Sequence, residues 1–181
     1  EMVRTQLYAK YQEQTYARGF TVITTLDSTR QQAANDALRK SLQDYDERHG
    51  FRGPEARLAA GALDQPAASN TAIVDALDAL PRLENLKPGV VLEYKPEAMS
   101  LLTQDGVIEL AKGDYAWAAI PPKKPLLRGD IVRVRKVGEK WKLAQIPQAQ
   151  AACVAVDPRD GAVQALAGGY DYFLSKFNHV T

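Results

Sequence analysis

The chain has 181 residues, of which 45% are hydrophobic and 25% charged, as in an ordinary globular protein with one domain and room for a second small one. Its 23 basic and 22 acidic residues give a net charge of +1, and this balance disfavours nucleic-acid binding, which usually needs a strong basic excess. The single cysteine, Cys153, excludes an internal disulfide and lies in an apolar run, as a small buried side chain does.

Signals for membrane insertion or export are not visible in the sequence. No stretch approaches the ~18 consecutive apolar residues of a membrane span, and no basic and apolar leader precedes the first helical pattern. The chain opens inside that pattern and carries a well-specified hairpin close to its end. We therefore interpret both ends as cut from a longer protein.

The N-terminal pattern predicts a helix followed by a strand. One apolar stripe at helical spacing runs over residues 2–17, and Gly19 is the expected stop. The stripe consists of Val3, Leu7 and Tyr11. The segment FTVITTLD, residues 20–27, alternates and is rich in β-branched side chains, which is typical of a strand.

A second helix is predicted from Ser28 to about Arg48, with Gly50 as its stop. Ser28 and Gln31 match a capping box, in which two side chains satisfy free backbone N–H groups at the start of a helix. The stripe expected to be buried consists of Ala34, Ala37, Leu38, Leu42 and Tyr45.

After Gly50 the composition changes to a loop rich in Ala, Gly and Pro over residues 51–69. A short amphipathic helix is predicted over 70–80, capped by Ser69 or Asn70. Its inward side chains are expected to be Ile73, Val74, Leu77 and Leu80.

Residues 88–147 have a β pattern. We predict a strand over 89–96, a hairpin over 99–111 that turns at Asp105-Gly106, and a hairpin over 130–146 that turns at Gly138-Glu139. A further short strand is predicted over 115–118, and the proline-rich segment 120–125 is a connector, since proline cannot donate to a sheet.

The resulting fold class is mainly β with flanking helices (α+β). About five or six short strands predict a small OB-like β-barrel, inserted between a strand–helix unit and a β-hairpin that pair into a host mini-sheet. The predicted divisions are a helical linker (1–19), a strand–helix unit (20–50), the inserted domain (51–150) and the first hairpin and lead-in of a further, truncated domain (151–181).

No catalytic constellation is found. The sequence lacks S-x-x-K, K-T-G, P-loop, dinucleotide-binding and zinc-site motifs. The acidic groups at 44–47, 75–78 and 157–160 are interpreted as solvated helix ends, a polar helix face and turn formers, and His49 as a surface histidine. We therefore predict no catalytic residue, no metal site and no cofactor in this chain.

A basic run in and before the second hairpin is the candidate partner-binding face. It contains Arg128, Arg133, Arg135, Lys140 and Lys142. With Tyr115 and Trp141 as stacking platforms, this face would also suit a single-stranded nucleic acid, as in some OB folds. A solvated hairpin face explains the same residues, and the charge balance favours that interpretation over nucleic acid.

Three segments together resemble class A, bifunctional penicillin-binding proteins of the Gram-negative 1A type. Residues 16–42 resemble the entry to the transpeptidase domain, and 44–55 (DYDERHGFRGPE) the entry to an inserted OB-like domain. Residues 152–178 resemble the first hairpin of the transpeptidase domain, with Ser175, Phe177 and Asn178 in an S-x-F-N stretch. His179 stands where the family usually has a basic residue.

The resemblance implies a parent enzyme with a glycosyltransferase and a D,D-transpeptidase domain, anchored in the inner membrane and facing the periplasm. The acylated serine would lie beyond Thr181. This chain would be a non-catalytic segment that docks an outer-membrane lipoprotein activator. The alternatives are an OB-type module for single-stranded nucleic acid and a structural spacer between the catalytic domains.

Overall fold

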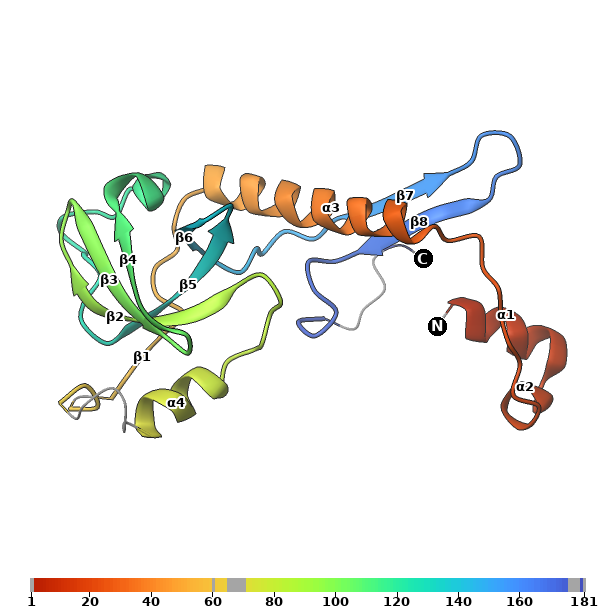
Figure 1. The fold of residues 1–181 in the computed structure, drawn as a ribbon, viewed down its shortest axis with the longest axis horizontal. Helices are drawn as coiled ribbons and strands as arrows, with labels where there is room; N and C mark the ends of the chain where they lie inside the picture. Colours follow the sequence, from red (N-terminus) through yellow and green to blue (C-terminus); the bar gives the residue numbers. More distant parts are fainter. Residues whose placement is uncertain (1, 60, 65–70, 176–179, 181) are drawn as a thin grey trace.

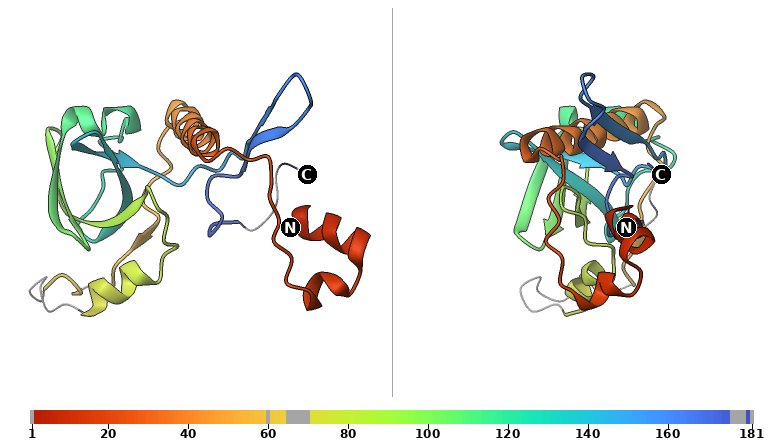
Figure 2. Two further views of the ribbon diagram at one scale, coloured as in Figure 1. Left: turned by 45° about the vertical axis from the view of Figure 1, so that its right-hand side comes forward. Right: turned by 90° about the vertical axis from the view of Figure 1, so that its right-hand side faces the viewer.

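The computed structural model describes residues 2–59, 61–64, 71–175 and 180. The long helix α3 (Ser28–Arg48) joins a curved sheet at its C-terminal end to a hairpin that lies along its N-terminal part (Figure 1). A pair of short helices, α1 (Met2–Tyr11) and α2 (Gln14–Ala17), lies beyond the hairpin (Figure 2). Among the residues described, no helix has both the length and the apolar character to cross a membrane.

The larger sheet has six strands, and all its pairings are antiparallel. The strand order is β1-β5-β2-β3-β4, with β6 also paired to β5. The strands are β1 (Ala56–Arg57), β2 (Lys87–Tyr94), β3 (Ala98–Thr103), β4 (Gly106–Ala111), β5 (Asp130–Val137) and β6 (Lys140–Ala144). The two predicted hairpins, β3–β4 and β5–β6, are confirmed, and their turns place Gly106 and Gly138 at φ +115° and +60°.

The sheet curls without closing. Strands β4 and β6 contact each other, but no ladder of hydrogen bonds joins them in the described structure, so the predicted barrel is an open, curved sheet. Two 3-10 turns follow β4, at Lys112–Asp114 and Ala116–Ala118, and the second occupies the segment predicted as a strand over 115–118. The first of these turns contacts both β4 and β6, where a closing strand would be needed.

Residues 115–118 form a tight turn in place of the predicted strand, and two aromatic side chains fix this turn to the rest of the OB-like unit. The buried Tyr115 hydroxyl donates to the carbonyl of Lys95 at 3.0 Å, and Trp117 Nε1 donates to the carbonyl of Leu143 at 3.0 Å. The backbone of this segment closes on itself, since Ala118 N donates to the carbonyl of Tyr115 at 3.0 Å and Ala119 N to that of Ala116 at 3.2 Å. Its N–H groups are therefore used within the turn and are not available to a neighbouring strand.

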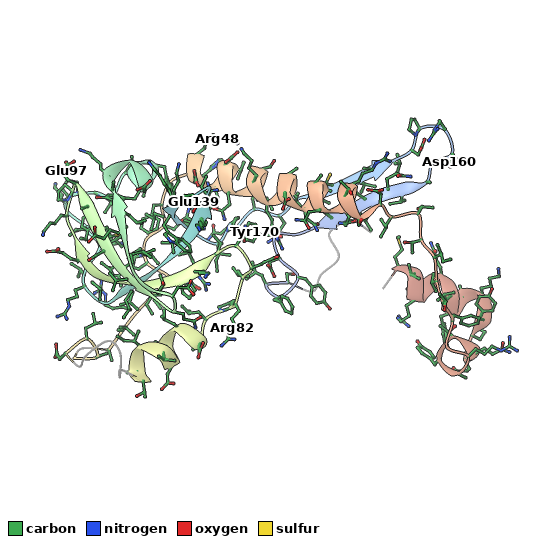
Figure 3. The ribbon with its side chains drawn as sticks, in the orientation of Figure 1. Arg48, Arg82, Glu97, Glu139, Asp160 and Tyr170 are labelled. Atoms are coloured by element: carbon green, nitrogen blue, oxygen red, sulfur yellow. The ribbon has the colours of Figure 1, made fainter. Side chains whose placement is uncertain are left out.

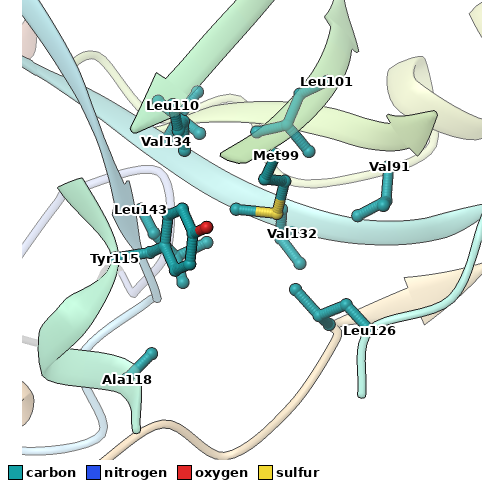
Figure 4. Close-up of a cluster of buried hydrophobic side chains, with 10 residues drawn as sticks. All are labelled: Val91, Met99, Leu101, Leu110, Tyr115, Ala118, Leu126, Val132, Val134 and Leu143. Carbon is teal, nitrogen blue, oxygen red and sulfur yellow. The ribbon is translucent and has the colours of Figure 1, made fainter. Parts of the chain in front are cut away.

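The core of the OB-like unit is one cluster of ten buried side chains, drawn in Figure 4. They come from strands β2 to β6, the 3-10 turns and the connector: Val91, Met99, Leu101, Leu110, Tyr115, Ala118, Leu126, Val132, Val134 and Leu143. A second cluster seats helix α4 (Thr71–Asp78) on the sheet through Ile73 and Leu77. Val74 was predicted to point inward but is 51% exposed, and the predicted caps Ser69 and Asn70 lie outside the described residues.

The N-terminal predictions need two corrections. The sequence predicts a single helix over 2–17 that stops at Gly19. The structure instead breaks it at Gln12, whose φ of +53° ends α1 at Tyr11. Residues 20–27 do not form a strand, and Ile23 is 93% exposed. Only the end of this segment reaches the hairpin, where Asp27 N donates to the carbonyl of Gln164 at 3.0 Å.

Helix α3 starts with a different cap from the one predicted. Asp27, not Ser28, is the N-cap, and its carboxylate accepts from Arg30 N at 2.9 Å. Gln31 is drawn away from the capping role because its amide bonds the backbone of Leu166 twice, at 3.0 Å each. The Gln31 side chain therefore bonds a distant strand and not the backbone at the start of its own helix, and the predicted capping box does not form.

The predicted hairpin near the end of the chain is confirmed as a two-stranded antiparallel sheet of β7 (Ala152–Val156) and β8 (Val163–Gly168). Helix α3 packs on both strands, as predicted for the host unit. Ala34, Leu38 and Leu42 of the predicted stripe meet Ala165, Ala167 and Tyr170, in a cluster that includes Leu83 and Leu86 from the loop before β2. Ala37 and Tyr45 were also expected to be buried, but both are exposed. Helix, hairpin and OB-like unit therefore meet in a third cluster, separate from the core of the OB-like unit.

Candidate functional site

The five cations of the predicted partner-binding face do not form one surface in the structure, because they differ in burial and in their partners. Arg133 is 2% exposed and forms a two-pronged ion pair with Glu55, at 2.6 and 2.8 Å. Its Nη1 also donates to the carbonyls of Pro81 and Leu86, at 2.9 and 3.2 Å. This guanidinium holds three segments of the OB-like unit together and faces inward.

The other four cations lie in different surroundings. Arg135 Nη2 donates to Glu47 of helix α3 at 2.7 Å, and Arg128 donates to the carbonyl of Leu63 at 3.0 Å. Lys140 is exposed and Lys142 half-buried on β6. The structure therefore leaves Arg128, Lys140 and Lys142 as the members of the predicted face that solvent or a partner can reach.

The stacking platforms predicted for nucleic acid are not free either. Tyr115 is 4% exposed and belongs to the core. Trp141 is half-buried, and the Lys87 ammonium lies over its ring, 5.6 Å from the ring centroid. A bare aromatic surface for bases is therefore missing from this part of the described structure.

The most elaborate polar arrangement in the molecule lies where the OB-like unit meets helix α3. Gln43 is 2% exposed, and its Nε2 donates to the Tyr170 hydroxyl at 2.9 Å and to the carbonyl of Gln145 at 3.1 Å. The Tyr170 hydroxyl donates to Asn85 Oδ1 at 2.9 Å. In Figure 3, Tyr170 lies beside α3 between the curved sheet and the hairpin.

Burial raises the pKa of Tyr170 above its ordinary value, because a phenolate would lose its hydration there. The hydrogen bonds from Gln43 and to Asn85 oppose this shift but are smaller than the effect of burial. Tyr170 is therefore a neutral phenol at neutral pH, and it can both donate and accept a hydrogen bond at the junction.

A second network joins the two connections of the OB-like unit. Asp46, 3% exposed, accepts from Arg52 Nη1 at 2.7 Å, and Arg52 Nη2 donates to the carbonyl of Ile146 at 2.6 Å. Gln145 Nε2 donates to the carbonyl of Gly50 at 2.9 Å, and its Oε1 accepts from Arg52 N at 3.1 Å. The chain entering the unit is thus fixed to the chain leaving it.

Arg39 closes the opposite side of the junction. Its guanidinium donates to Glu84 at 2.7 Å and to the carbonyl of Tyr170 at 3.3 Å, and lies 3.6 Å from the carboxylate of Asp171. We call Arg39, Gln43, Asp46, Arg52, Asn85, Gln145 and Tyr170 the junction site. Charge-assisted bonds of this kind fix the orientation of the segments that they join.

The junction site was missed from the sequence. Asp46 was interpreted as part of a solvated helix end, yet it continues the apolar stripe of Leu38 and Leu42 at helical spacing. That position was the available signal, since a carboxylate on a buried stripe needs a partner. His49 is exposed as predicted and stacks on Tyr45, with the ring centroids 4.1 Å apart.

The junction site is arranged for positioning, because its hydrogen bonds hold α3, the loop before β2 and the segment after β8 in one orientation. Within the described ranges, no group of three or more His, Cys, Asp or Glu could hold a metal ion. The pKa of Asp157 is lowered by hydrogen bonds from Arg159, but both belong to the exposed β7–β8 turn. Of the S-x-F-N stretch, Phe177 and Asn178 lie outside the described residues, as does His179.

Comparison with known proteins identifies the OB-like unit. The family described as "Penicillin-binding protein OB-like domain" matches residues 51–149. Penicillin-binding protein 1A of Escherichia coli (strain K12) is 38% identical over 194 residues, which cover 100% of this chain and 23% of that protein. Penicillin-binding protein 1A of Pseudomonas aeruginosa is 33% identical over 98% of this chain and 22% of its own length.

The fold is also found in a solved relative. The crystal structure of penicillin-binding protein 1A from Haemophilus influenzae superposes with a TM-score of 0.79 at 33% identity, over 98% of this chain and 26% of that one. The chain therefore spans about a quarter of the length of these relatives. From the matched domain, the identities and the shared fold, this chain belongs to the penicillin-binding proteins of the 1A type found in Gram-negative bacteria, and its curved sheet is their OB-like domain.

Proposed function

We propose that this chain is a non-catalytic regulatory and interaction segment of a bifunctional peptidoglycan synthase. The parent would carry a glycosyltransferase that polymerises glycan strands and a D,D-transpeptidase that cross-links their peptides. Family membership supports the parent's identity. The observation that carries the segment's role is the junction site, where the OB-like domain is fixed to α3 and to Tyr170 beyond β8.

Catalysis is assigned to other parts of the parent. The sequence contains no S-x-x-K motif, which the acyl-serine chemistry of the transpeptidase requires. The parent is proposed to be anchored in the inner membrane with this segment in the periplasm. The expected partner is an outer-membrane lipoprotein that activates the synthase.

The fold provides a physical route for such control. The OB-like domain lies at the C-terminal end of α3, away from the β7–β8 hairpin (Figure 1). A partner that binds one orientation of the domain more tightly than another shifts the equilibrium between the two. Because Gln145 of the domain accepts a hydrogen bond from Gln43 on α3, and Asn85 of the domain accepts one from Tyr170, a change of domain orientation acts directly on α3 and on the segment after β8.

A structural spacer is the second candidate function, because a buried polar junction also suits a rigid connection between two catalytic domains. The two candidates differ in what the surface of the OB-like domain binds. A spacer needs no partner, whereas a regulatory segment must hold one with useful affinity.

A capture experiment separates these candidates. The chain would be immobilised and exposed to the detergent-solubilised envelope of the source bacterium, with retained proteins identified by mass spectrometry. We expect one outer-membrane lipoprotein to be retained, and to be lost from a control chain in which residues 56–148 are replaced by a short turn. If the folded chain retained no lipoprotein, the spacer would be the better account.

A further inference from the structure

A groove of about 350 Å³ lies on the OB-like domain between the entry segment 51–57 and the connector 120–127. Its walls are mostly apolar and rich in proline: Phe51, Pro54, Ile120, Pro121, Pro125, Leu126 and Leu127. Leu126 belongs to the core at 5% exposure, whereas its neighbour Leu127 is 47% exposed. The groove therefore joins the core to an apolar surface that solvent reaches.

The groove is held in shape by its own hydrogen bonds. The carboxylate of Asp130, 1% exposed, accepts from Leu127 N at 2.8 Å and from Arg57 Nε at 2.5 Å. Lys124 N donates to the carbonyl of Pro121 at 2.9 Å, and proline rings restrict the connector further. A wall that is already ordered loses little conformational entropy when a partner binds.

The rim of the groove carries uncompensated positive charge. Two of the cations that line it have carboxylate partners, Arg52 with Asp46 and Arg57 with Asp130. Lys123 and Lys124 are exposed on the connector, and neither forms an ion pair within the part of the chain that the structure describes. Apolar walls beside two free ammonium groups complement a ligand that combines carboxylates with an apolar side chain.

The exposed Lys140 of the predicted basic face lacks this combination. Lys140 lines a different hollow, which it shares with the carboxylates of Glu97, Glu109, Asp114 and Glu139. An acidic ligand would be repelled there, so the reachable part of the predicted basic face is a poorer match for it than the proline-lined groove.

We propose that this groove docks an extended acidic segment of the partner protein, with its carboxylates on Lys123 and Lys124 and an apolar side chain between Pro54 and Leu127. The inference rests on the proposed function, because it assigns the surface and the chemistry of that docking. The volume lies at the lower end of the roughly 300–1,000 Å³ typical of ligand sites, which suits a few side chains of an extended peptide.

The test uses a labelled peptide of alternating leucine and glutamate, titrated into the 181-residue chain and followed by fluorescence anisotropy. A leucine–lysine peptide of the same length and vesicles of anionic phospholipid are parallel probes. The variant pair Lys123→Glu/Lys124→Glu reverses the charge at the groove. The matched pair Lys140→Glu/Lys142→Glu makes the same change in charge on β6, and circular dichroism confirms that both variants fold.

We expect the leucine–glutamate peptide to bind, and its affinity to fall about tenfold or more in the groove variant and less than twofold in the β6 variant. Equal losses in the two variants, failure of this peptide to bind, or a preference for the leucine–lysine peptide would overturn the proposal. So would binding to the vesicles that exceeds binding to the peptide, since the site would then favour a lipid surface.

Failure of this inference can be told apart from failure of the proposed function. If the chain captures a lipoprotein and the groove variant captures it equally well, the regulatory role stands and the groove is the wrong surface. If the chain captures no lipoprotein, the regulatory role fails, and the peptide titration decides separately whether the groove binds acidic segments.

Discussion

The Tyr170 hydroxyl and the Gln43 amide, separated by 127 positions in the sequence, meet at 2.9 Å in a buried site. The same hydroxyl donates to Asn85 of the OB-like domain at 2.9 Å. One phenol therefore links helix α3, the loop before β2 and the segment after β8. The OB-like domain and its host unit are expected to respond together when this link is broken.

Replacing Tyr170 with phenylalanine tests that link. The Tyr170→Phe change keeps the ring but leaves Gln43 and Asn85 without their shared partner, so we expect a loss of about 1–3 kcal/mol in the free energy of unfolding. Urea denaturation measures the loss. Tyr172→Phe is the matched control, because Tyr172 is 64% exposed, and we expect it to change stability by less than about 0.5 kcal/mol. Equal effects would show that the junction hydroxyl contributes no stability.

The same tyrosine gives the chain a pH dependence at the alkaline end. The folded pKa of Tyr170 is raised by burial, so the folded state keeps this proton at a pH where the unfolded chain has lost it. The stability that this buried, protonated phenol adds is fully present below the pKa of an unfolded tyrosine, near 10, and is lost as the pH rises above that value. Denaturation from pH 9 to 11 should show a shallower decline in Tyr170→Phe than in the parent chain. An identical decline in both would contradict the assignment.

The ion pair between Arg133 and Glu55 predicts a non-additive pattern. Replacing Glu55 with leucine leaves the Arg133 guanidinium, 1% exposed, without its counter-charge, and we expect a loss of about 3–5 kcal/mol. The double change Glu55→Leu/Arg133→Met removes both charges and should cost less than the single one. Lys136→Ala is the control, since its partner Glu139 is 96% exposed and surface pairs contribute about 0–1 kcal/mol. Urea denaturation of Glu55→Leu, Arg133→Met and the double variant measures the pattern, and a double variant whose loss equals the sum of the two single losses would contradict a coupled buried pair.

The start of helix α3 can be tested with two alanine changes at neighbouring positions. Asp27→Ala removes the carboxylate that accepts from Arg30 N and should cost about 1 kcal/mol. Ser28→Ala alters the residue that the sequence pattern favours as the cap, and we expect it to be near neutral. Thermal unfolding of both variants measures the difference. The reverse order of losses would restore Ser28 as the cap.

Local signals in the sequence predicted a large part of the fold. The hairpins at Gly106 and Gly138 were predictable because a positive φ angle in a tight turn selects glycine. Helix α3 was predictable because its apolar stripe has helical spacing and Gly50 follows it. In each case the residues that decide the structure are close together in the sequence.

The predictions that were wrong concern segments whose structure is decided by contacts with residues far away in the sequence. Gln31 bonds Leu166 on β8, which removes it from the predicted capping box. Tyr115 is held by the carbonyl of Lys95, which turns a predicted strand into 3-10 turns. Alternation predicts a strand over 20–27, but a strand also needs a partner along its length, and this segment has one only at its end.

The candidate site was harder to predict for the same reason. Arg133 and Arg135 lie on one face of β5, as the alternation requires, but the pattern does not show that Glu55 and Glu47 meet them. Partner carboxylates from the entry segment and from α3 turn these two cations inward. The junction site itself unites Gln43, Asn85 and Tyr170, which no local motif connects.

We propose that the OB-like domain mediates control of the parent synthase by a partner protein. The most direct measurement is the cross-linking rate of the full-length parent with and without the captured lipoprotein, compared with a variant in which residues 56–148 are replaced by a short turn. Glycan polymerisation without the lipoprotein is the control for folding. We predict that the variant keeps this basal polymerisation and loses the stimulation of cross-linking, and stimulation that persists in the variant would contradict the claim.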